Sequence, residues 1–388
     1  MTRITYGMIS NDVQVGIQNN AVKLDELMTK LSTGKVLNQP SDDSVGVTKS
    51  LKLHSQSNRQ DQYLRNIQDG QAWLSTSETA LKSGNDVLQR ANELAIQGSN
   101  GTYSAPERLY LRSEVRVLVD QMVSIANTTL KGDFIFAGTQ TDTPPYSIES
   151  ATDTLSNVEN DNAELLDTIP ATVQLYDTTL RDSSTPTGNP PAKDILPGTM
   201  TIDGLVEGTD YTVDYKNGTV NFLTDTAGDL AAVQGLTINY DWIRRSEKDM
   251  SGSVNREVQQ NMTIPVNVGP DQAFGGRTET SVFDALIGLM QGLHTNSPSQ
   301  TQASMPEVQD SLKRLLQAQT TAGSRMNRLD TTQDQNRQDY TALQEQTSLI
   351  EDVDFAKTIS DFQNRQQVYQ ASMQVGAKII QPSLVNFL

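Results

Sequence analysis

The chain has 388 residues, a formal net charge of −17 and no cysteine. Its hydrophobic content of 36% and aromatic content of 5% are low for several compact cores, so we expect elongated helical packing. The absence of cysteine excludes disulfides and thiol chemistry, and the acidic balance argues against nucleic acid, whose binding proteins concentrate Lys and Arg on one face.

The acidic excess lies mainly in the middle of the chain. Residues 141–250 hold 6 basic and 19 acidic side chains, which indicates a well-solvated surface there. The opening residues MTRITYGMIS lack the apolar run of a cleavable signal peptide, and no stretch reaches the roughly 18 apolar residues that span a membrane. We therefore expect neither a cleavable signal peptide nor membrane insertion.

The first helix is predicted within residues 1–40 by a narrow apolar stripe. Its members alternate spacings of four and three: Ile17, Ala21, Leu24, Met28 and Leu31. Such a stripe is typical of a coiled coil and is too narrow to fold alone. Gly34 and Pro40 predict the end of the helix, and residues 41–43 supply the N-cap oxygens of the next one.

A second helix is predicted from about Ser44 to Gln97, where there is no proline. Apolar residues, most of them large, recur there every seven positions: Ile67, Leu74, Leu81, Leu88 and Ala95. Small residues alternate with the large ones, which lets a neighbouring helix approach closely. A turn at residues 98–106 and a third helix from Glu107 then complete an antiparallel hairpin inside a bundle.

The periodicity changes between about residues 147 and 250, where glycine, proline and threonine are frequent and short alternating runs appear. Asn217-Gly218 separates two such runs and predicts a hairpin. A further strand is predicted at residues 236–242. We expect a small sandwich or barrel there, followed by a second β element at 254–268.

A long helix is predicted over residues 308–350, because a seven-residue repeat keeps its phase throughout. The phase is lost near residues 351–354, which indicates a turn or kink. A new apolar series then begins: Phe355, Ile359, Phe362, Tyr369, Met373 and Ile380. We expect this series and the first stripe to pair with each other and with other copies, as an assembly seam.

The order of elements predicts a mainly α fold with a β-rich insert, an elongated out-and-back helical bundle with paired terminal coiled-coil helices. Three domains are expected. They are a terminal coiled coil from 1–43 and 351–388, a bundle from 44–146 and 251–350 with a small β element near 254–268, and an acidic β-rich outer domain at 147–250.

Several segments resemble bacterial flagellins. LMTKLSTGKVLNQPSDDSVG at 27–46 resembles their N-terminal signature, and ANELAIQGSNGTYS at 91–104 resembles their second helix and its turn. Residues 350–388 are similar to their C-terminal segment. Within that superfamily, FIFAGTQTDTPPY at 134–146 is more similar to the hook-associated junction proteins than to filament flagellins.

This resemblance, which covers about residues 1–140 and 280–388, implies a flagellin-like fold and a structural adapter between the flagellar hook region and the filament. It also implies export through the flagellar type III apparatus to an extracellular flagellum. The implied partners are other copies in a ring or helical layer, the preceding hook-associated protein, flagellin and an export chaperone. A flagellin-type filament subunit remains the alternative.

The sequence also bears on two other classes of function, an enzyme and a secreted coiled-coil adhesin or tail fibre. An enzyme is disfavoured, because the two histidines, His54 and His294, form no HExxH pattern and the chain has no phosphate loop. We therefore expect no catalytic, metal or cofactor site. A secreted coiled-coil adhesin or tail fibre would carry its seam in one continuous rod rather than at both ends of the chain.

Overall fold

The computed structural model describes residues 6–41, 43–154, 172–175, 194–223, 237–246, 248–276 and 280–380. The chain divides into two compact units, Met1–Arg65 with Gln333–Leu388, and Asn66–Thr332. Two long helices, α2 (Ser44–Ser99) and α8 (Pro298–Glu351), run through both units. The three-domain division drawn from the sequence remains a prediction.

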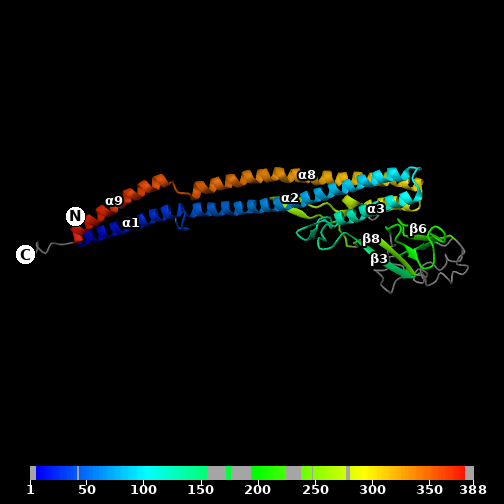
Figure 1. The fold of residues 1–388 in the computed structure, drawn as a ribbon. Coiled ribbons are helices and arrows are strands. Elements are labelled where there is room, and N and C mark those ends of the chain that lie inside the picture. Colours follow the sequence, from blue (N-terminus) through cyan, green and yellow to red (C-terminus); the bar gives the residue numbers. More distant parts are fainter. Residues whose placement is uncertain are drawn as a thin grey trace, which may run out of the picture. The chain divides into compact units, whose positions relative to one another are not determined.

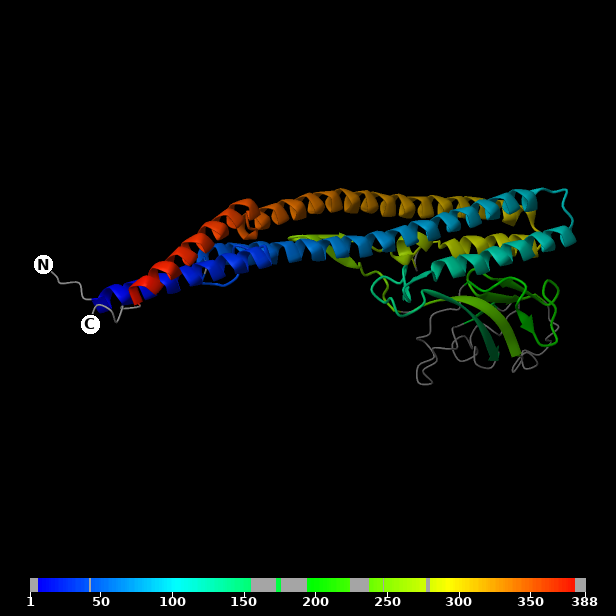
Figure 2. The same ribbon diagram turned by 60° about the vertical axis from the view of Figure 1, so that its left-hand side comes forward.

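The first unit pairs the two ends of the described chain. Helix α1 (Tyr6–Thr33) packs along α9 (Phe355–Ile380), as Figures 1 and 2 show. Helix α1 ends where predicted, because Gly34 adopts a φ of 71° that favours glycine. The Asp43 carboxylate accepts a hydrogen bond of 3.0 Å from the Val45 N–H and caps α2. The predicted break after the long helix is also confirmed, since α8 ends at Glu351 and α9 begins at Phe355.

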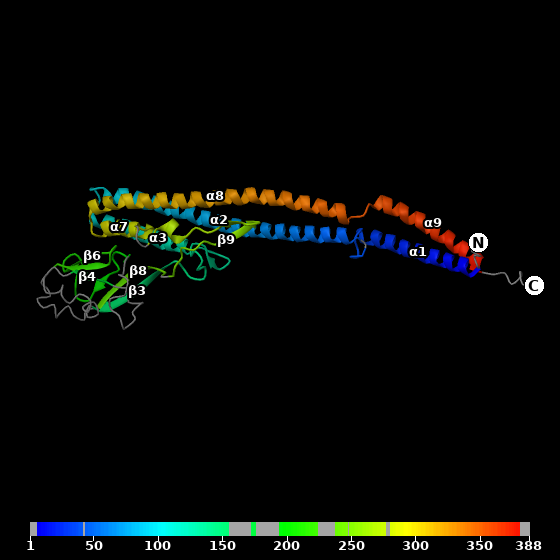
Figure 3. The same cartoon turned by 180° about the vertical axis from the view of Figure 1, so that it is seen from behind.

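The second unit is built on a helical bundle. Helices α3 (Ala105–Ala126) and α7 (Val282–His294) pack against each other beside α2 and α8 (Figure 3). A capping box starts α7, with the Asp284 N–H donating to Ser281 Oγ at 2.9 Å and the Ser281 N–H donating back to the carboxylate. The short helix α6 (Pro270–Phe274) has no periodic signal in the sequence and was not predicted.

Burial confirms the two predicted heptad rows. In α2, every large residue of the row that starts at Ile67 and ends at Ala95 is 0% exposed. Close approach at the small positions is also observed, since a Cβ on Gly84 would lie 3.2 Å from Leu315 Cδ1. In α8 every position of the predicted row is buried or half-buried, including the polar ones: Val308, Leu312, Leu315, Gln319, Ala322, Met326, Leu329, Gln333, Asn336, Tyr340, Leu343, Thr347 and Ile350.

The described part of the β-rich insert forms two antiparallel sheets of three strands, ordered β3-β8-β5 and β4-β7-β6. The strands are β3 (Tyr146–Thr154), β4 (Thr172–Gln174), β5 (Thr201–Ile202), β6 (Tyr211–Asp214), β7 (Thr219–Phe222) and β8 (Thr237–Arg245). The predicted hairpin at Asn217-Gly218 is confirmed with a four-residue loop, because the Gly218 N–H bonds the Asp214 carbonyl at 2.8 Å.

Two further β elements belong to the second unit. The predicted strand pair near residues 254–268 is the hairpin β9 (Asn255–Gln259) and β10 (Met262–Pro265). A small pair that was not predicted, β1 (Thr129–Leu130) and β2 (Asp133–Phe134), follows α3. Both elements of this pair are too short to show an alternating pattern in the sequence.

The insert and the bundle share one buried core. Tyr211 and Trp242 of the insert belong to the same hydrophobic cluster as Phe283 of α7. An ion pair of 2.8 Å joins Lys216 of the insert to Glu307 of α8. Among the described residues, no helix is both long and apolar enough to cross a membrane.

Candidate assembly surface

The inner face of the α1–α9 pair is a heptad seam. In α1 the half-buried row is Val13, Ile17, Asn20, Leu24, Leu27 and Leu31, and in α9 the corresponding row is Thr358, Phe362, Arg365, Tyr369, Ser372 and Gly376. Both rows alternate spacings of four and three, which keeps each helix facing the other along its length. The seam is therefore continuous, but four of the six members of the α9 row are polar or lack a side chain.

Two contacts fix the register of this seam. The Asn20 side chain donates a hydrogen bond of 3.1 Å to Ser372 Oγ. A Cβ on Gly376 would lie only 2.8 Å from Ile17 Cδ1, so the absence of a side chain there makes room for isoleucine. A polar pair within an apolar seam selects one register at some cost in stability.

The structure distributes the predicted seam residues over two environments. Those half-buried are Ile17, Ala21, Leu24, Leu31, Phe362 and Tyr369. Met28 is 60% exposed, and Phe355, Ile359 and Met373 are between 44% and 52% exposed. Ile380 is the last residue of α9. Their shared role as an assembly seam stays a prediction, and the exposed members do not pack in the α1–α9 seam.

A second apolar row lies on α1 opposite its inner face. Met8, Val15 and Val22 are separated by seven residues and are each at least 46% exposed. Since successive helical residues turn by about 100°, Val22 and Leu24 point to opposite sides of the helix. The sequence contains this signal as a plain seven-residue repeat, but the predicted seam was the denser series from Ile17 to Leu31.

On α9 the exposed apolar residues flank the inner row on both sides. Ile359 and Met373 lie on one flank, whereas Val368 and Val375 lie on the other. Phe355, seven residues before Phe362, is in line with the inner row. These exposed apolar residues make the two flanks candidates for an interaction surface, because large exposed apolar patches in soluble proteins mark interaction sites. The pair therefore offers apolar surface in three directions, one on α1 and two on α9.

A polar joint connects α1 and α9 to the adjoining parts of α2 and α8 within the first unit. The Val36 N–H donates to the Glu351 carbonyl at 2.6 Å, and the Val353 N–H donates to the Gly34 carbonyl at 3.0 Å. Residues 34–36 and 351–353 thus lie antiparallel, with a bridge between Lys35 and Asp352. The two chain breaks that the sequence predicts are one structural feature.

The carboxylate of Glu351 lies at the centre of this joint, with its side chain only 10% exposed. It accepts hydrogen bonds from Lys35 Nζ at 2.6 Å and from His54 Nε2 at 2.7 Å, and also from the Ser50 hydroxyl. Burial raises the pKa of this carboxyl, but the hydrogen bonds from Lys35, Ser50 and His54 outweigh burial and lower it to about 2. His54, one of the two histidines in the sequence, is part of the joint.

The second histidine also belongs to a polar network, in the second unit. The Arg112 guanidinium donates to His294 Nδ1 at 2.8 Å, so that nitrogen must be unprotonated, since guanidinium cannot accept. His294 Nε2 then donates to Glu207 at 2.9 Å, and the Tyr215 hydroxyl donates to the same carboxylate at 2.7 Å. This network fastens the insert to α3 and α7, and it presents no nucleophile.

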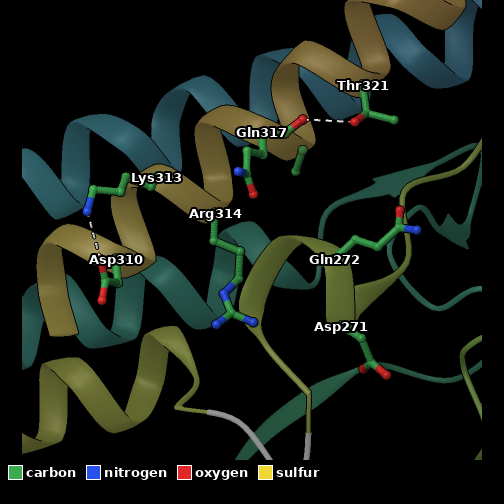
Figure 4. Close-up of a pocket in the computed structure, with 8 residues that line it drawn as sticks. Asp271, Gln272, Asp310, Lys313, Arg314, Gln317 and Thr321 are labelled. Carbon is green, nitrogen blue, oxygen red and sulfur yellow. Dashed lines mark hydrogen bonds and ion pairs between the residues drawn. The ribbon is translucent and has the colours of Figure 1, made fainter.

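An open groove of about 540 Å³ lies between α6 and α8 in the same unit. Figure 4 shows Asp271 and Gln272 on one side and Asp310, Lys313 and Arg314 on the other. These charges already have partners, since Asp310 pairs with Lys313 at 2.9 Å and Arg245 pairs with Asp271. Within the described ranges, no group of three or more His, Cys, Asp or Glu side chains is placed to hold a metal ion.

The chain matches two models of the flagellin family. The bacterial flagellin N-terminal helical region matches residues 4–141, and the bacterial flagellin C-terminal helical region matches residues 305–388. These segments together make up more than half of the chain and include α1, α9 and the joint. The chain belongs to the flagellin superfamily.

Curated relatives match over part of their length. The chain is 35% identical over 124 residues to the flagellar filament 33 kDa core protein of Treponema phagedenis, covering 32% of this chain and 43% of the relative. It is 40% identical over 110 residues to polar flagellin C of Vibrio parahaemolyticus, covering 28% of this chain and 29% of the relative. The aligned part thus spans less than half of each relative.

A solved structure shows the same fold over a larger part of the chain. The protein, from Vibrio parahaemolyticus, is described as flagellar hook-associated and shares 16% sequence identity. The TM-score is 0.52, and the superposition covers 80% of this chain and 99% of the other. The predicted fold class, mainly α with a β-rich insert and flagellin-like terminal helices, is confirmed.

Proposed function

We propose that this chain is a structural subunit of the bacterial flagellum that assembles with other copies through the α1–α9 pair. The observation that carries the proposal is the apolar surface that this pair leaves exposed. A coiled-coil pair in isolation has one apolar seam, whereas α1 has a second row opposite its seam and α9 has one on each flank. Neighbours in several directions would bury all three, as in a ring or a helical layer.

The energetics of such a layer favour assembly over the separate pair. Complete burial of one Val, Ile, Met or Phe side chain contributes about 1.5–3 kcal/mol. The pair exposes several such residues in each copy, and its own seam is only half-buried. The proposed interface therefore stabilises both the assembly and the two terminal helices.

Within the flagellum, we place the subunit at the junction between the hook and the filament, as a hook-filament junction protein of the FlgL type. FIFAGTQTDTPPY at 134–146 resembles the hook-associated junction proteins, and the structure that covers 80% of this chain is described as hook-associated. The proposed partners are the preceding hook-associated protein, flagellin and an export chaperone. The location is extracellular, reached through the flagellar export apparatus.

A flagellin-type filament subunit is the second candidate. It is favoured by the curated relatives, which are described as flagellins or filament core proteins. Both candidates require the same terminal helices and the same export route. They differ in where the subunit lies and in how many copies are needed.

Deletion of the gene, followed by electron microscopy and immunogold labelling of an epitope-tagged complementing copy, separates the candidates. A junction subunit predicts hooks without filaments, with unpolymerised flagellin in the medium, and a label confined to the base of restored filaments. A label along the whole filament would establish the filament subunit instead. Normal filaments in the deletion strain would contradict the junction role.

A further inference from the structure

The joint beside the α1–α9 pair contains more ordered contacts than a simple chain break needs. Two main-chain hydrogen bonds already hold residues 34–36 against 351–353. An antiparallel contact this short, which is not part of a larger sheet, does little by itself to fix the directions of α1 and α9. Further restraints come from the side chain of Glu351, which is hydrogen-bonded to three other side chains of the joint.

Glu351 occupies a position that is unfavourable for a helix by itself. It is the last residue of α8, where the negative end of the helix dipole disfavours a carboxylate. Its contacts are instead made outside α8, with Lys35 in the first chain break and with Ser50 and His54, one turn apart on α2. One buried carboxylate thus connects α8, α2 and the segment that follows α1.

The surrounding charges reinforce this arrangement. Lys35 Nζ lies 2.6 Å from Glu351 and 3.4 Å from Asp352, so its single positive charge is shared between these two acids. The hydrogen bond to Glu351 raises the pKa of Lys35, so this residue stays charged. Asp354 caps α9, with its carboxylate accepting from the Lys357 N–H at 3.1 Å. The acidic residues of 351–354 therefore have different structural roles: Glu351 holds the joint and Asp354 caps α9.

We propose that Glu351 is a positioning residue. Its hydrogen bonds to Lys35, Ser50 and His54, which we call the latch, hold the joint in one geometry and thereby set the direction in which the α1–α9 pair leaves α2 and α8. The inference rests on the proposed assembly through that pair. The three apolar faces of the pair meet their neighbours in register only if every copy presents them in the same direction. A joint without its latch would let the pair swivel, although each helix could still form.

Amide hydrogen exchange tests the latch in the full-length monomer, with selective ¹⁵N labelling of valine. The probes are the Val36 and Val353 amides, which bond across the joint. The Val47 amide, bonded to the Asp43 carbonyl at 2.8 Å, is the internal reference on α2. Glu351→Gln should accelerate exchange at both probes at least about tenfold and leave Val47 unchanged, because a hydrogen-bonded charge is lost.

Two further variants control this measurement. Lys35→Met removes the ammonium group without changing α8 and should accelerate exchange at the same two probes. It covers the case in which the glutamine of the first variant keeps some of the hydrogen bonds that Glu351 accepts. Glu345→Gln removes an exposed carboxylate from the same helix and should change neither. Unchanged exchange at Val36 and Val353 in both Glu351→Gln and Lys35→Met would overturn the latch.

Complementation of the deletion strain then tests the positioning role. Glu351→Gln is expected to be exported with wild-type helical content but to restore filaments in far fewer cells than the wild type. Accelerated exchange together with normal filaments would overturn the positioning role. If the wild-type gene itself proves unnecessary for filaments, the proposed function fails, while the exchange arm still decides whether Glu351 latches the joint.

Discussion

At the scale of single residues, Glu207 is the acceptor on which the attachment of the insert depends. It collects hydrogen bonds from His294 and Tyr215, and His294 is in turn held in one tautomer by Arg112. Burial raises the pKa of Glu207, but the hydrogen bonds from His294 and Tyr215 outweigh burial, so its pKa is lowered. A Cβ on Gly198 would collide with the Arg112 guanidinium, which shows how closely the insert approaches α3.

Glu207→Gln should lower the free energy of unfolding of the second unit by about 1–3 kcal/mol, because the charged acceptor of two hydrogen bonds is lost. Urea titration followed by circular dichroism measures the change. Glu78→Gln, at an exposed position on α2, is the matched control and should change stability by less than about 0.5 kcal/mol. Equal stability of the two variants would contradict the role given to Glu207.

The latch residue predicts a dependence of stability on pH. The folded-state pKa of Glu351 is about 2, below the ordinary glutamate value of about 4.3. Its contribution is therefore fully present above about pH 4.3 and is lost as the pH falls towards 2. The charged or titratable groups that face it are Lys35, His54 and Asp352.

The comparison of wild type with Glu351→Gln isolates this contribution from other acids. The difference in melting temperature between the two proteins should be fully present at about pH 5 and should shrink steadily between about pH 4 and 2. Thermal melts at a series of pH values measure it. A difference that stays constant down to pH 2 would show that Glu351 is not held ionised by the joint.

At the scale of elements, the outer row of α1 separates folding from assembly. Val22 is 58% exposed, so Val22→Asp should change the monomer's melting temperature little. In the proposed layer the new carboxylate would be buried without a partner, which costs several kcal/mol in every copy. We expect an exported monomer that restores no stable filament in the deletion strain.

Two substitutions in α1 serve as controls for Val22→Asp. Val22→Ile keeps the surface apolar and should restore filaments. Leu24→Asp places the charge in the seam with α9 and should weaken the pair as well as abolish assembly, since Leu24 is half-buried there. Normal filaments from Val22→Asp would show that the outer row of α1 faces solvent in the flagellum.

The same elements show what the sequence could and could not predict. The α8 row from Val308 to Ile350 was predicted because a repeat sustained over many turns allows only one buried stripe. On α9, a single apolar series was predicted where the structure has an inner row and two flanks. Periodicity shows that residues share a face but does not show which neighbour each face meets.

The polar contacts of the candidate site could not be predicted for a related reason. His54 and Glu351 are separated by 297 positions, and Glu207 and His294 by 87 positions. Such pairs arise from the way in which the helices return on one another, and no local pattern records them. The break near 351–354 was predicted from the loss of heptad phase, but its pairing with residues 34–36 was not.

At the scale of the whole molecule, we expect the second unit to fold alone and the α1–α9 pair to need other copies. The second unit has a shared hydrophobic core in which helix α7 is almost completely buried. The α1–α9 pair has a half-buried, partly polar seam and exposed apolar rows. Helices with apolar stripes as narrow as these have marginal stability in water without further packing.

Amide exchange of α1 and α9 in the monomer and in the assembled state, compared by mass spectrometry, tests this central claim most directly. Residues 6–33 and 355–380 should exchange rapidly in a dilute monomer and become strongly protected in the assembly, whereas residues 282–294 should be protected in both. Strong protection of both terminal helices in the dilute monomer, or none in the assembly, would contradict the account.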